Sequence, residues 1–142
     1  FGVEDQGWAA WFIIALLLKR PITLYGNGKQ VRDLLHVHDL CALYEQAIKN
    51  VGAVRGHAFN IGGGRENAQS LLEFFKEIET RHGLKSPMAY ARIRPGDQKV
   101  FISDNSKIKK HLGWKPRISV ENGVAALVSW VKENRDSIAS LY

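Results

Sequence analysis

The sequence predicts an α/β fold: a β-hairpin and a small mixed sheet packed by helices. Two observations support this class. Short β-favourable runs alternate with amphipathic helical segments, and glycine-containing turns separate many of them. The 142 residues, of which 45% are hydrophobic and 24% charged, have the size and composition of one ordinary globular domain. We therefore expect a single domain over residues 1–142.

Five segments have helical patterns. The run after Asp5, "DQGWAAWFIIALLLKR", predicts a buried helix that stops at Pro21. Its apolar part is shorter than the roughly 20 residues that span a bilayer, so no membrane association is expected. The helix in "LCALYEQAIKN" has His38 or Asp39 as its expected N-cap. The other three helices are predicted in "SLLEFFKEIETRHG", "DNSKIKKHLGW" and "SVENGVAALVSWVKENRDSI".

Five runs have the residue preferences of strands. "ITLY" and "QVRDLLHV" flank "GNGK", a pattern typical of a β-hairpin. "HAFNI" predicts a third strand that ends in three glycines. "MAYARIR" and "KVFIS" predict two more strands, one on each side of "PGD". The mixture of a hairpin with strand–helix alternation indicates both antiparallel and parallel pairing.

Composition also restricts the cellular setting and the partners. The chain begins with Phe1, from which we expect a fragment of a longer protein. A single cysteine, Cys41, excludes an internal disulfide and favours a reducing compartment, so we expect a cytoplasmic protein. The net charge of +6 suits an anionic partner. The basic residues form no stripe interleaved with aromatics, so a nucleic-acid partner is not expected.

Three motifs invite a catalytic or cofactor interpretation that their spacing does not support. Tyr25 and Lys29 have Tyr-x-x-x-Lys spacing, but the residues between them form a glycine turn and not a helix. The glycines at 62–64 lack both common phosphate-loop patterns, so a close-packed turn is favoured. His36 and His38 have no third ligand at recognisable spacing, so we expect no metal site.

Arginine and aspartate recur together in "VRD" and "RPGDQ". The planar guanidinium binds phosphate through two hydrogen bonds, and a nearby carboxylate accepts hydrogen bonds from ribose hydroxyls. The alternative is that each arginine forms a surface salt bridge with its neighbouring acid, worth about 0 to 1 kcal/mol. Residue types alone slightly favour the salt bridges.

Four segments together resemble the C-terminal part of extended short-chain dehydrogenases of the NAD-dependent epimerase/dehydratase family. They are "PITLYGNGKQVRDLLHVHDL", "FNIGGG", "RPGDQKVFISDNSKIKKHLGWKP" and "GVAALVSWV", in the family's order and spacing. "DQGWAAWF", "GNGKQVRD" and "DQKVFISD" more particularly resemble a branch that acts on CDP-sugars. The resemblance covers nearly the whole chain and implies that it is the substrate-binding part of a nucleotide-sugar epimerase.

The resemblance implies a set of substrate-binding residues. Arg32 and Arg94 would contact the diphosphate, Asp97 the ribose, and Tyr25 the base. Asp33 would keep the hairpin and Arg32 in place. A further segment that approaches the nucleotide in this family comprises Gln6, Gly7 and Trp8.

The chain departs from the family in one respect, since it carries neither the glycine fingerprint for NAD nor the catalytic Tyr-x-x-x-Lys. The resemblance implies that an N-terminal Rossmann domain supplies both, so we expect no catalytic residue and no NAD binding in this fragment alone. That domain and a CDP-sugar are the expected partners, and a homodimer is one way to cover exposed apolar surface. The alternatives are a dehydratase or reductase of the same family and a non-catalytic binding module.

Overall fold

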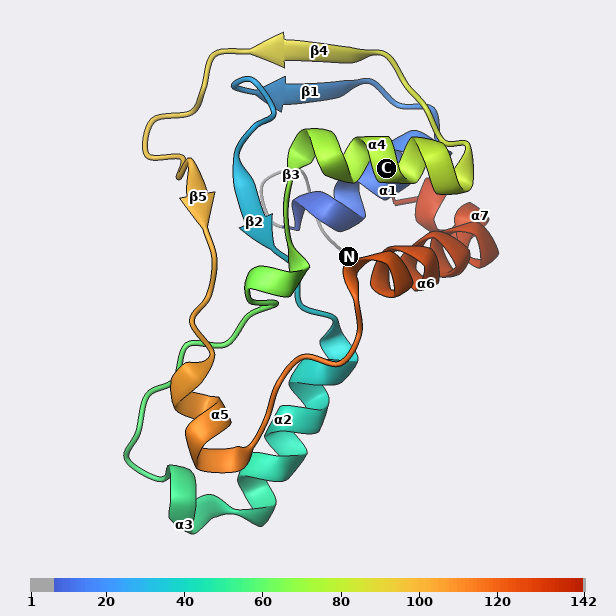
Figure 1. Ribbon diagram of the computed structural model, residues 1–142. Helices are drawn as coiled ribbons and strands as arrows, with labels where there is room; N and C mark the ends of the chain where they lie inside the picture. Colours follow the sequence, from blue (N-terminus) through green and yellow to red (C-terminus); the bar gives the residue numbers. More distant parts are fainter. Residues whose placement is uncertain (1–6, 142) are drawn as a thin grey trace. The chain divides into compact units, whose positions relative to one another are not determined.

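The computed structural model describes residues 7–141, and their contacts group them into two compact units. Unit 1 contains residues 7–30, 71–97 and 124–141 of this range, and unit 2 contains residues 31–70 and 98–123. The predicted α/β class is confirmed, because helices and short strands are mixed in the chain (Figure 1). The expectation of one domain stays a prediction.

Unit 1 is built on a pair of parallel strands. Their register runs from Ile22 opposite Met88 to Tyr25 opposite Ala91, and Figure 1 shows the two strands side by side. The elements of this unit are α1 (Trp8–Leu17), β1 (Ile22–Tyr25), α4 (Leu71–His82), β4 (Met88–Ala91), most of α6 (Val120–Glu133) and α7 (Arg135–Ala139).

The core of unit 1 explains why α1 is apolar around its whole circumference. A helix that is hydrophobic on every side is stable only where it is buried, and five consecutive residues from Phe12 to Leu16 are buried. Fully buried side chains of other elements of the unit include Ile22, Phe74, Ile78 and Val131. Aromatic rings add to this core, since Phe12 and Phe75 lie with their centroids 4.8 Å apart.

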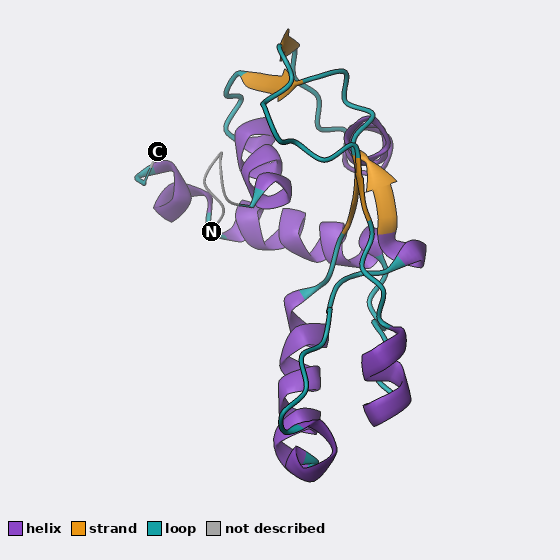
Figure 2. Ribbon diagram, turned by 90° about the vertical axis from the view of Figure 1, so that its left-hand side faces the viewer, coloured by secondary structure: helices purple, strands orange, loops and turns teal. Residues whose placement is uncertain are grey.

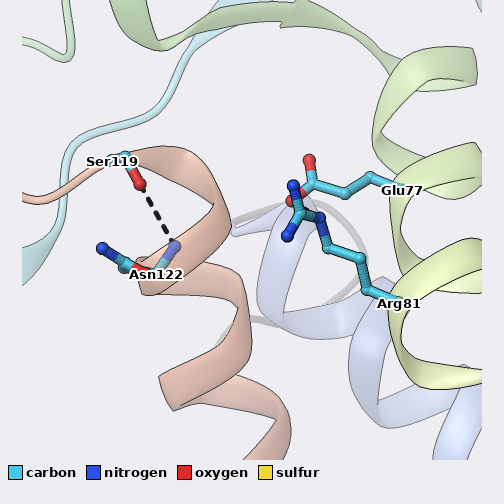
Figure 3. Close-up of polar contacts among 4 residues, drawn as sticks. All are labelled: Glu77, Arg81, Ser119 and Asn122. Atoms are coloured by element: carbon cyan, nitrogen blue, oxygen red, sulfur yellow. Dashed lines mark hydrogen bonds and ion pairs between the residues drawn. The ribbon is translucent and has the colours of Figure 1, made fainter.

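Two polar contacts, each within one unit, mark helix surfaces and ends (Figure 3). The side chains of Glu77 and Arg81 lie one turn apart on α4, with Arg81 Nε 3.6 Å from Glu77 Oε1. Ser119 Oγ accepts a hydrogen bond from Asn122 N–H at 3.3 Å, which satisfies one of the free donors at the start of α6. The predicted last helix is interrupted at Asn134, so α7 is separate from α6.

Unit 2 contains a three-stranded sheet and a helical end. The sheet has the order β3-β2-β5, in which β2 pairs antiparallel with β3 and parallel with β5. Figures 1 and 2 both show α5 beside α2, and buried Leu43, Ile108 and Trp114 form the cluster among these segments. The elements of this unit are β2 (Val31–Asp33), α2 (Val37–Lys49), α3 (Val51–Val54), the 3-10 helix Arg65–Asn67, β3 (Ala68–Ser70), β5 (Val100–Phe101) and α5 (Ser106–Leu112).

The predicted hairpin of "ITLY" and "QVRDLLHV" is wrong. β1 pairs with β4, whereas β2 pairs with β3 and β5 in a different sheet. The turn between them is present, with Gly26 at φ 92° and Gly28 at φ 73°. The side chain of Gln30 donates a hydrogen bond to the carbonyl of Tyr25 at 2.7 Å, which links the two ends of the turn. Turn residues therefore predicted the turn, but long-range partners decided the pairing.

Three further local predictions require correction. "HAFNI" is not a strand, since no described strand pairs with this segment. Its side chains Phe59 and Ile61 pack instead on the cluster of Leu43, Ile108 and Trp114. The N-cap of α2 is His36 and not the predicted His38 or Asp39. The Nδ1 atom of His36 accepts a hydrogen bond from His38 N–H at 3.2 Å. For α1, Gly7 stands at the N-cap position, and the predicted cap Asp5 lies outside the described residues.

Candidate functional site

The candidate site of unit 1 lies where β1 and β4 end. Because these strands are parallel, their carboxyl ends meet at one edge, with Tyr25 opposite Ala91. The backbone continues this alignment beyond the strands, since Gly26 N–H donates to the Ala91 carbonyl at 2.9 Å. In open α/β sheets, ligands bind outside the carboxyl ends of the strands. The loops 26–30 and 92–97 therefore start at the edge where a ligand is expected.

Two of the predicted site residues contact each other at this edge. Arg94 Cζ lies 3.9 Å from the centroid of the Tyr25 ring, so the guanidinium lies over one face of the ring. Tyr25 is half-buried and Arg94 is exposed. The attraction of a cation to the face of an aromatic ring contributes about 0.5–1 kcal/mol at an exposed position. A residue from "ITLY" and one from "RPGD" thus form one stacked pair.

Asp97 closes the loop that carries Arg94. Its backbone N–H donates to the carbonyl of Arg94 at 3.2 Å, and Gly96 before it has φ 80°, a conformation that a residue with a Cβ seldom adopts. Asp97 is half-buried. The Pro-Gly turn predicted from the sequence is therefore present, and it brings the backbone of Asp97 into hydrogen-bond contact with that of Arg94.

The turn at 26–30 is fixed from both ends. Asn27 Oδ1 accepts a hydrogen bond from Lys29 N–H at 3.0 Å, and the carbonyl of Gly28 accepts one from Leu72 N–H at 3.1 Å. A Cβ on Gly28 would lie 2.8 Å from a Leu72 methyl group, so a larger residue has no room there. This turn docks on the start of α4 and keeps the carboxyl end of β1 in place.

Arg32, another predicted site residue, belongs to unit 2. It lies in β2 opposite Gln69 of β3 and Phe101 of β5, is half-buried, and its Nη1 donates to the Val31 carbonyl at 2.7 Å. The neighbouring Asp33 ties segments together: its Oδ2 accepts from Gly64 N–H at 2.8 Å and from Ser103 N–H at 3.1 Å. Asp33 therefore has a supporting role, but through donors far away in sequence.

Of the three N-terminal candidates, the structure describes Gly7 and Trp8. Gln6 is outside the described residues. Gly7 precedes α1 in a left-handed conformation with φ 116°. The ring of Trp8 lies 5.0 Å from that of Phe74 and 6.0 Å from that of Phe12, measured between centroids. These contacts give Trp8 a packing role, and its contact with a nucleotide stays a prediction.

The residues at 62–64 do not fit the pyrophosphate of a dinucleotide. Such a cradle uses glycines so that the ligand can approach the backbone. Here a Cβ on Gly62 would overlap Ser103 Oγ, and one on Gly63 would overlap the Leu34 carbonyl oxygen. Asn105 closes the turn further, because its side chain accepts from Gly62 N–H at 3.1 Å and donates to the Gly62 carbonyl at 2.9 Å. These glycines pack against the chain's own atoms.

Metal and membrane sites receive no support from the described part of the chain. His36 and His38 lie at the start of α2 with ring centroids 4.8 Å apart. Within residues 7–141, no three His, Cys, Asp or Glu side chains gather as a metal ion requires. None of the helices described there combines the length and the apolar character needed to cross a bilayer.

Sequence reasoning missed two side chains that organise unit 2. Asp39 is buried, and its Oδ2 accepts hydrogen bonds from Arg117 and Ile118 N–H, each at 3.0 Å. Asn105 pins the glycine turn as described above. An acid at a helix start and an Asn in "SDNS" are ordinary capping and loop signals, so no pattern pointed to these long-range contacts.

A groove in unit 2 contains none of the predicted site residues. It has a volume of about 310 Å³ and lies between α2 and the segment 113–117. Its lining mixes Lys49, Lys115 and Arg117 with the acids Asp39 and Glu45. This groove is thus not part of the candidate site, which consists of the Tyr25–Arg94 pair and the turns that hold it at the ends of β1 and β4.

Comparisons with known proteins show which proteins this chain resembles. The family model described as GDP-mannose 4,6 dehydratase matches residues 10–127. CDP-paratose 2-epimerase of Salmonella typhi is 41% identical over 135 residues, which are 92% of this chain and 40% of that protein. A dTDP-glucose 4,6-dehydratase of Xanthomonas campestris pv. campestris (strain B100) is 37% identical over 134 residues, 87% of this chain and 37% of that protein.

A solved structure shares the fold. The UDP-glucuronic acid 4-epimerase from Bacillus cereus, in complex with UDP-glucuronic acid and NAD, superposes with a TM-score of 0.80 at 26% identity. The match covers 94% of this chain and 42% of that one. The chain thus spans about 40% of the length of the relatives that it matches.

Proposed function

Because the chain belongs to the GDP-mannose 4,6 dehydratase family, we propose that it is the nucleotide-sugar-binding part of an NAD-dependent sugar-nucleotide epimerase. CDP-paratose 2-epimerase is the proposed activity of the full-length protein, supported by 41% identity to the Salmonella typhi enzyme. The observation that carries the proposal is the Tyr25–Arg94 stack at the carboxyl ends of β1 and β4. There a guanidinium, a ring and the Asp97 carboxylate suit a phosphate, a base and a ribose.

The proposed roles follow from the chemistry of each group. Arg94 and Arg32 bind the diphosphate, and Asp97 accepts hydrogen bonds from ribose hydroxyls. Tyr25 lies beside the base, and Gln6, Gly7 and Trp8 approach the nucleotide. Binding energy from these parts of the substrate positions the sugar for reaction without contact to the reacting carbon.

NAD is proposed as the cofactor of the full-length protein. The Bacillus cereus epimerase holds NAD together with its UDP-sugar. NAD supplies the acceptance and return of a hydride when it is bound. The packed glycines at 62–64 do not form its cradle, so we propose that a Rossmann domain outside these 142 residues holds it. A cytoplasmic location and a homodimer complete the proposal.

A dehydratase is the second candidate. The dTDP-glucose 4,6-dehydratase of Xanthomonas campestris is 37% identical, close to the value for the epimerase. Both activities use the same grip on the nucleotide, so the substrate-binding residues do not separate them. Product analysis does: incubation of the full-length protein with NAD and a CDP-sugar yields a C2 epimer under the first proposal and a 4-keto-6-deoxy sugar under the second.

Replacement of Arg94 tests the nucleotide grip. We expect Arg94→Ala to raise the Kd of CDP-glucose about tenfold in isothermal titration calorimetry of the full-length protein, since a charge-assisted hydrogen bond is worth about 1.5–3 kcal/mol. Arg135→Ala, at an exposed arginine in α7, is the matched control for the loss of one positive charge. Equal affinities of wild type and Arg94→Ala would remove Arg94 from the site. Titration with UDP-glucose and dTDP-glucose in parallel tests the preference for cytosine.

A further inference from the structure

Basic side chains gather at the helical end of unit 2. Residues 49–59 and 106–117 contain seven lysine and arginine residues and no aspartate or glutamate, whereas the whole chain has a net charge of +6. These stretches form the end of α2, the whole of α3 and α5, and the loop after α5 (Figures 1 and 2). The positive excess of the chain is therefore concentrated at one end of one unit.

The helix ends in this region account for only part of the charge. The carboxyl end of a helix carries the equivalent of about half a negative charge, which favours lysine and arginine nearby. Two helices end here, α2 with 13 residues and α5 with 7. Two such ends offset about one positive charge, so most of the seven cations remain uncompensated by them.

The groove between α2 and the segment 113–117 lies among these cations. Lys49 lines it from the end of α2, and Lys115 and Arg117 line it from the loop after α5. Within residues 7–141, the side chains of these three residues form no ion pair and no hydrogen bond. The volume of about 310 Å³ is at the low end of the range for small-molecule sites. The groove therefore suits a small anion.

The two acids that line the groove do not cancel this charge. Asp39 is buried, and its Oδ2 already accepts hydrogen bonds from the backbone N–H groups of Arg117 and Ile118. Glu45 is exposed and offsets one of the three exposed cations. The lining therefore keeps a net positive charge on its exposed side chains.

From these observations we infer that the groove is a binding site for a small anion with several negative charges, of the diphosphate class. The planar guanidinium of Arg117 suits two phosphate oxygens, and the ammonium groups of Lys49 and Lys115 act as point charges beside it. No predicted substrate-binding residue lines the groove. The inference thus goes beyond the proposed function and does not depend on it.

Titration of the full-length protein with sodium pyrophosphate tests this site. Trp114 lines the groove, and its indole N–H donates to the Asp39 carbonyl at 3.2 Å, so its signal reports on binding there. After incorporation of 5-fluorotryptophan, we expect a saturable shift of the Trp114 fluorine NMR signal, which Trp114→Phe identifies. Arg117→Ala and Lys49→Ala should each raise the Kd about two- to fivefold, the range of one exposed ion pair.

The controls separate a site from general screening by salt. Lys76→Ala removes an exposed lysine of α4 in unit 1 and should keep the wild-type Kd. Sodium chloride at the same ionic strength should give no saturable shift. A Trp114 signal that does not respond to pyrophosphate, or a Kd that is the same in wild type, Arg117→Ala and Lys49→Ala, would overturn the inference. Binding of CDP-glucose in that case would leave the proposed function standing.

Discussion

Asp33 and Asp39 show how single carboxylates hold separate parts of unit 2 together. Each accepts two backbone N–H groups through one oxygen: Asp33 those of Gly64 and Ser103, and Asp39 those of Arg117 and Ile118. Hydrogen bonds to an ionised acceptor are roughly twice as strong as neutral ones. These residues stabilise the framework on which Arg32 and α2 are placed.

His36 makes the start of α2 sensitive to pH. The pKa of His36 is lowered from its ordinary value of 6.5, first because burial disfavours the charged ring and second because His38 is close, while Asp39 opposes the shift. The neutral ring accepts the capping hydrogen bond from His38 N–H. Since the unfolded chain takes up the proton at a higher pH than the folded one, the stabilisation is complete above pH 6.5 and is lost as the pH falls through the lower pKa of the folded state.

We therefore expect the free energy of unfolding in urea to fall between pH 7.5 and pH 5.5 by more in the wild type than in His36→Asn. Asparagine keeps an N-cap acceptor but does not titrate in this range. His57→Asn, at an exposed histidine, is the matched control and should retain the wild-type pH dependence. An identical pH dependence in wild type and His36→Asn would show that the cap does not sense pH.

At the scale of elements, glycines have opposite roles in unit 2. Gly63 is buried, and a Cβ there would overlap the Leu34 carbonyl oxygen. Gly52 lies inside α3, where nothing comes within 4 Å of a Cβ. Neither residue has a positive φ, so the difference between them is one of space and not of backbone conformation. Gly63 is thus required for close packing of the turn after "HAFNI", whereas Gly52 in α3 has room for a larger side chain.

This contrast gives a paired prediction. We expect Gly63→Ala to lower the free energy of unfolding by about 1–3 kcal/mol, the cost of overpacking. Gly52→Ala should raise it by up to about 1 kcal/mol, because alanine favours a helix more than glycine does. Urea titrations followed by circular dichroism measure both. A Gly63→Ala variant as stable as wild type would mean that the turn at 62–64 has room for a ligand.

At the scale of the whole chain, three separate stretches build unit 1. Residues 124–141 belong to it together with residues 7–30 and 71–97, and they contribute the buried side chains of Val124, Val128, Val131 and Ile138. Unit 2 is complete without them. Burying one such side chain contributes about 1.5–3 kcal/mol, so their sum is comparable to the whole stability of a small domain.

A chain that ends at Gly123 should therefore lose the structure of unit 1 and keep that of unit 2. In a heteronuclear NMR spectrum, we expect the amide signals of α1 and α4 to collapse to the random-coil region. The indole N–H of Trp114, which donates to the Asp39 carbonyl at 3.2 Å, should stay dispersed. Loss of the Trp114 signal as well would show that the chain unfolds as one domain, as its length predicts.

Local features of this fold can be predicted from the sequence alone. The α/β class, the helical segments, the turns at "GNGK" and "PGD" and the packed glycines after "HAFNI" follow from propensity, periodicity and turn chemistry, which act between neighbouring residues. The resemblance to the family, and not a local pattern, implied Tyr25, Arg94 and Asp97 as candidates, and the structure places all three in unit 1. The predictions of class, helices and turns needed no information about distant parts of the chain.

Which distant segments meet could not be predicted in this way. β1 pairs with β4 more than 60 residues later and not with β2, and "HAFNI" packs by its side chains without a described strand partner. The stack of Arg94 on Tyr25 and the donors of Asp33 and Asp39 likewise depend on such contacts. Strand pairing and buried hydrogen bonds are stabilised by contacts between residues far apart in sequence. Turn and strand propensities depend on neighbouring residues and do not specify those partners.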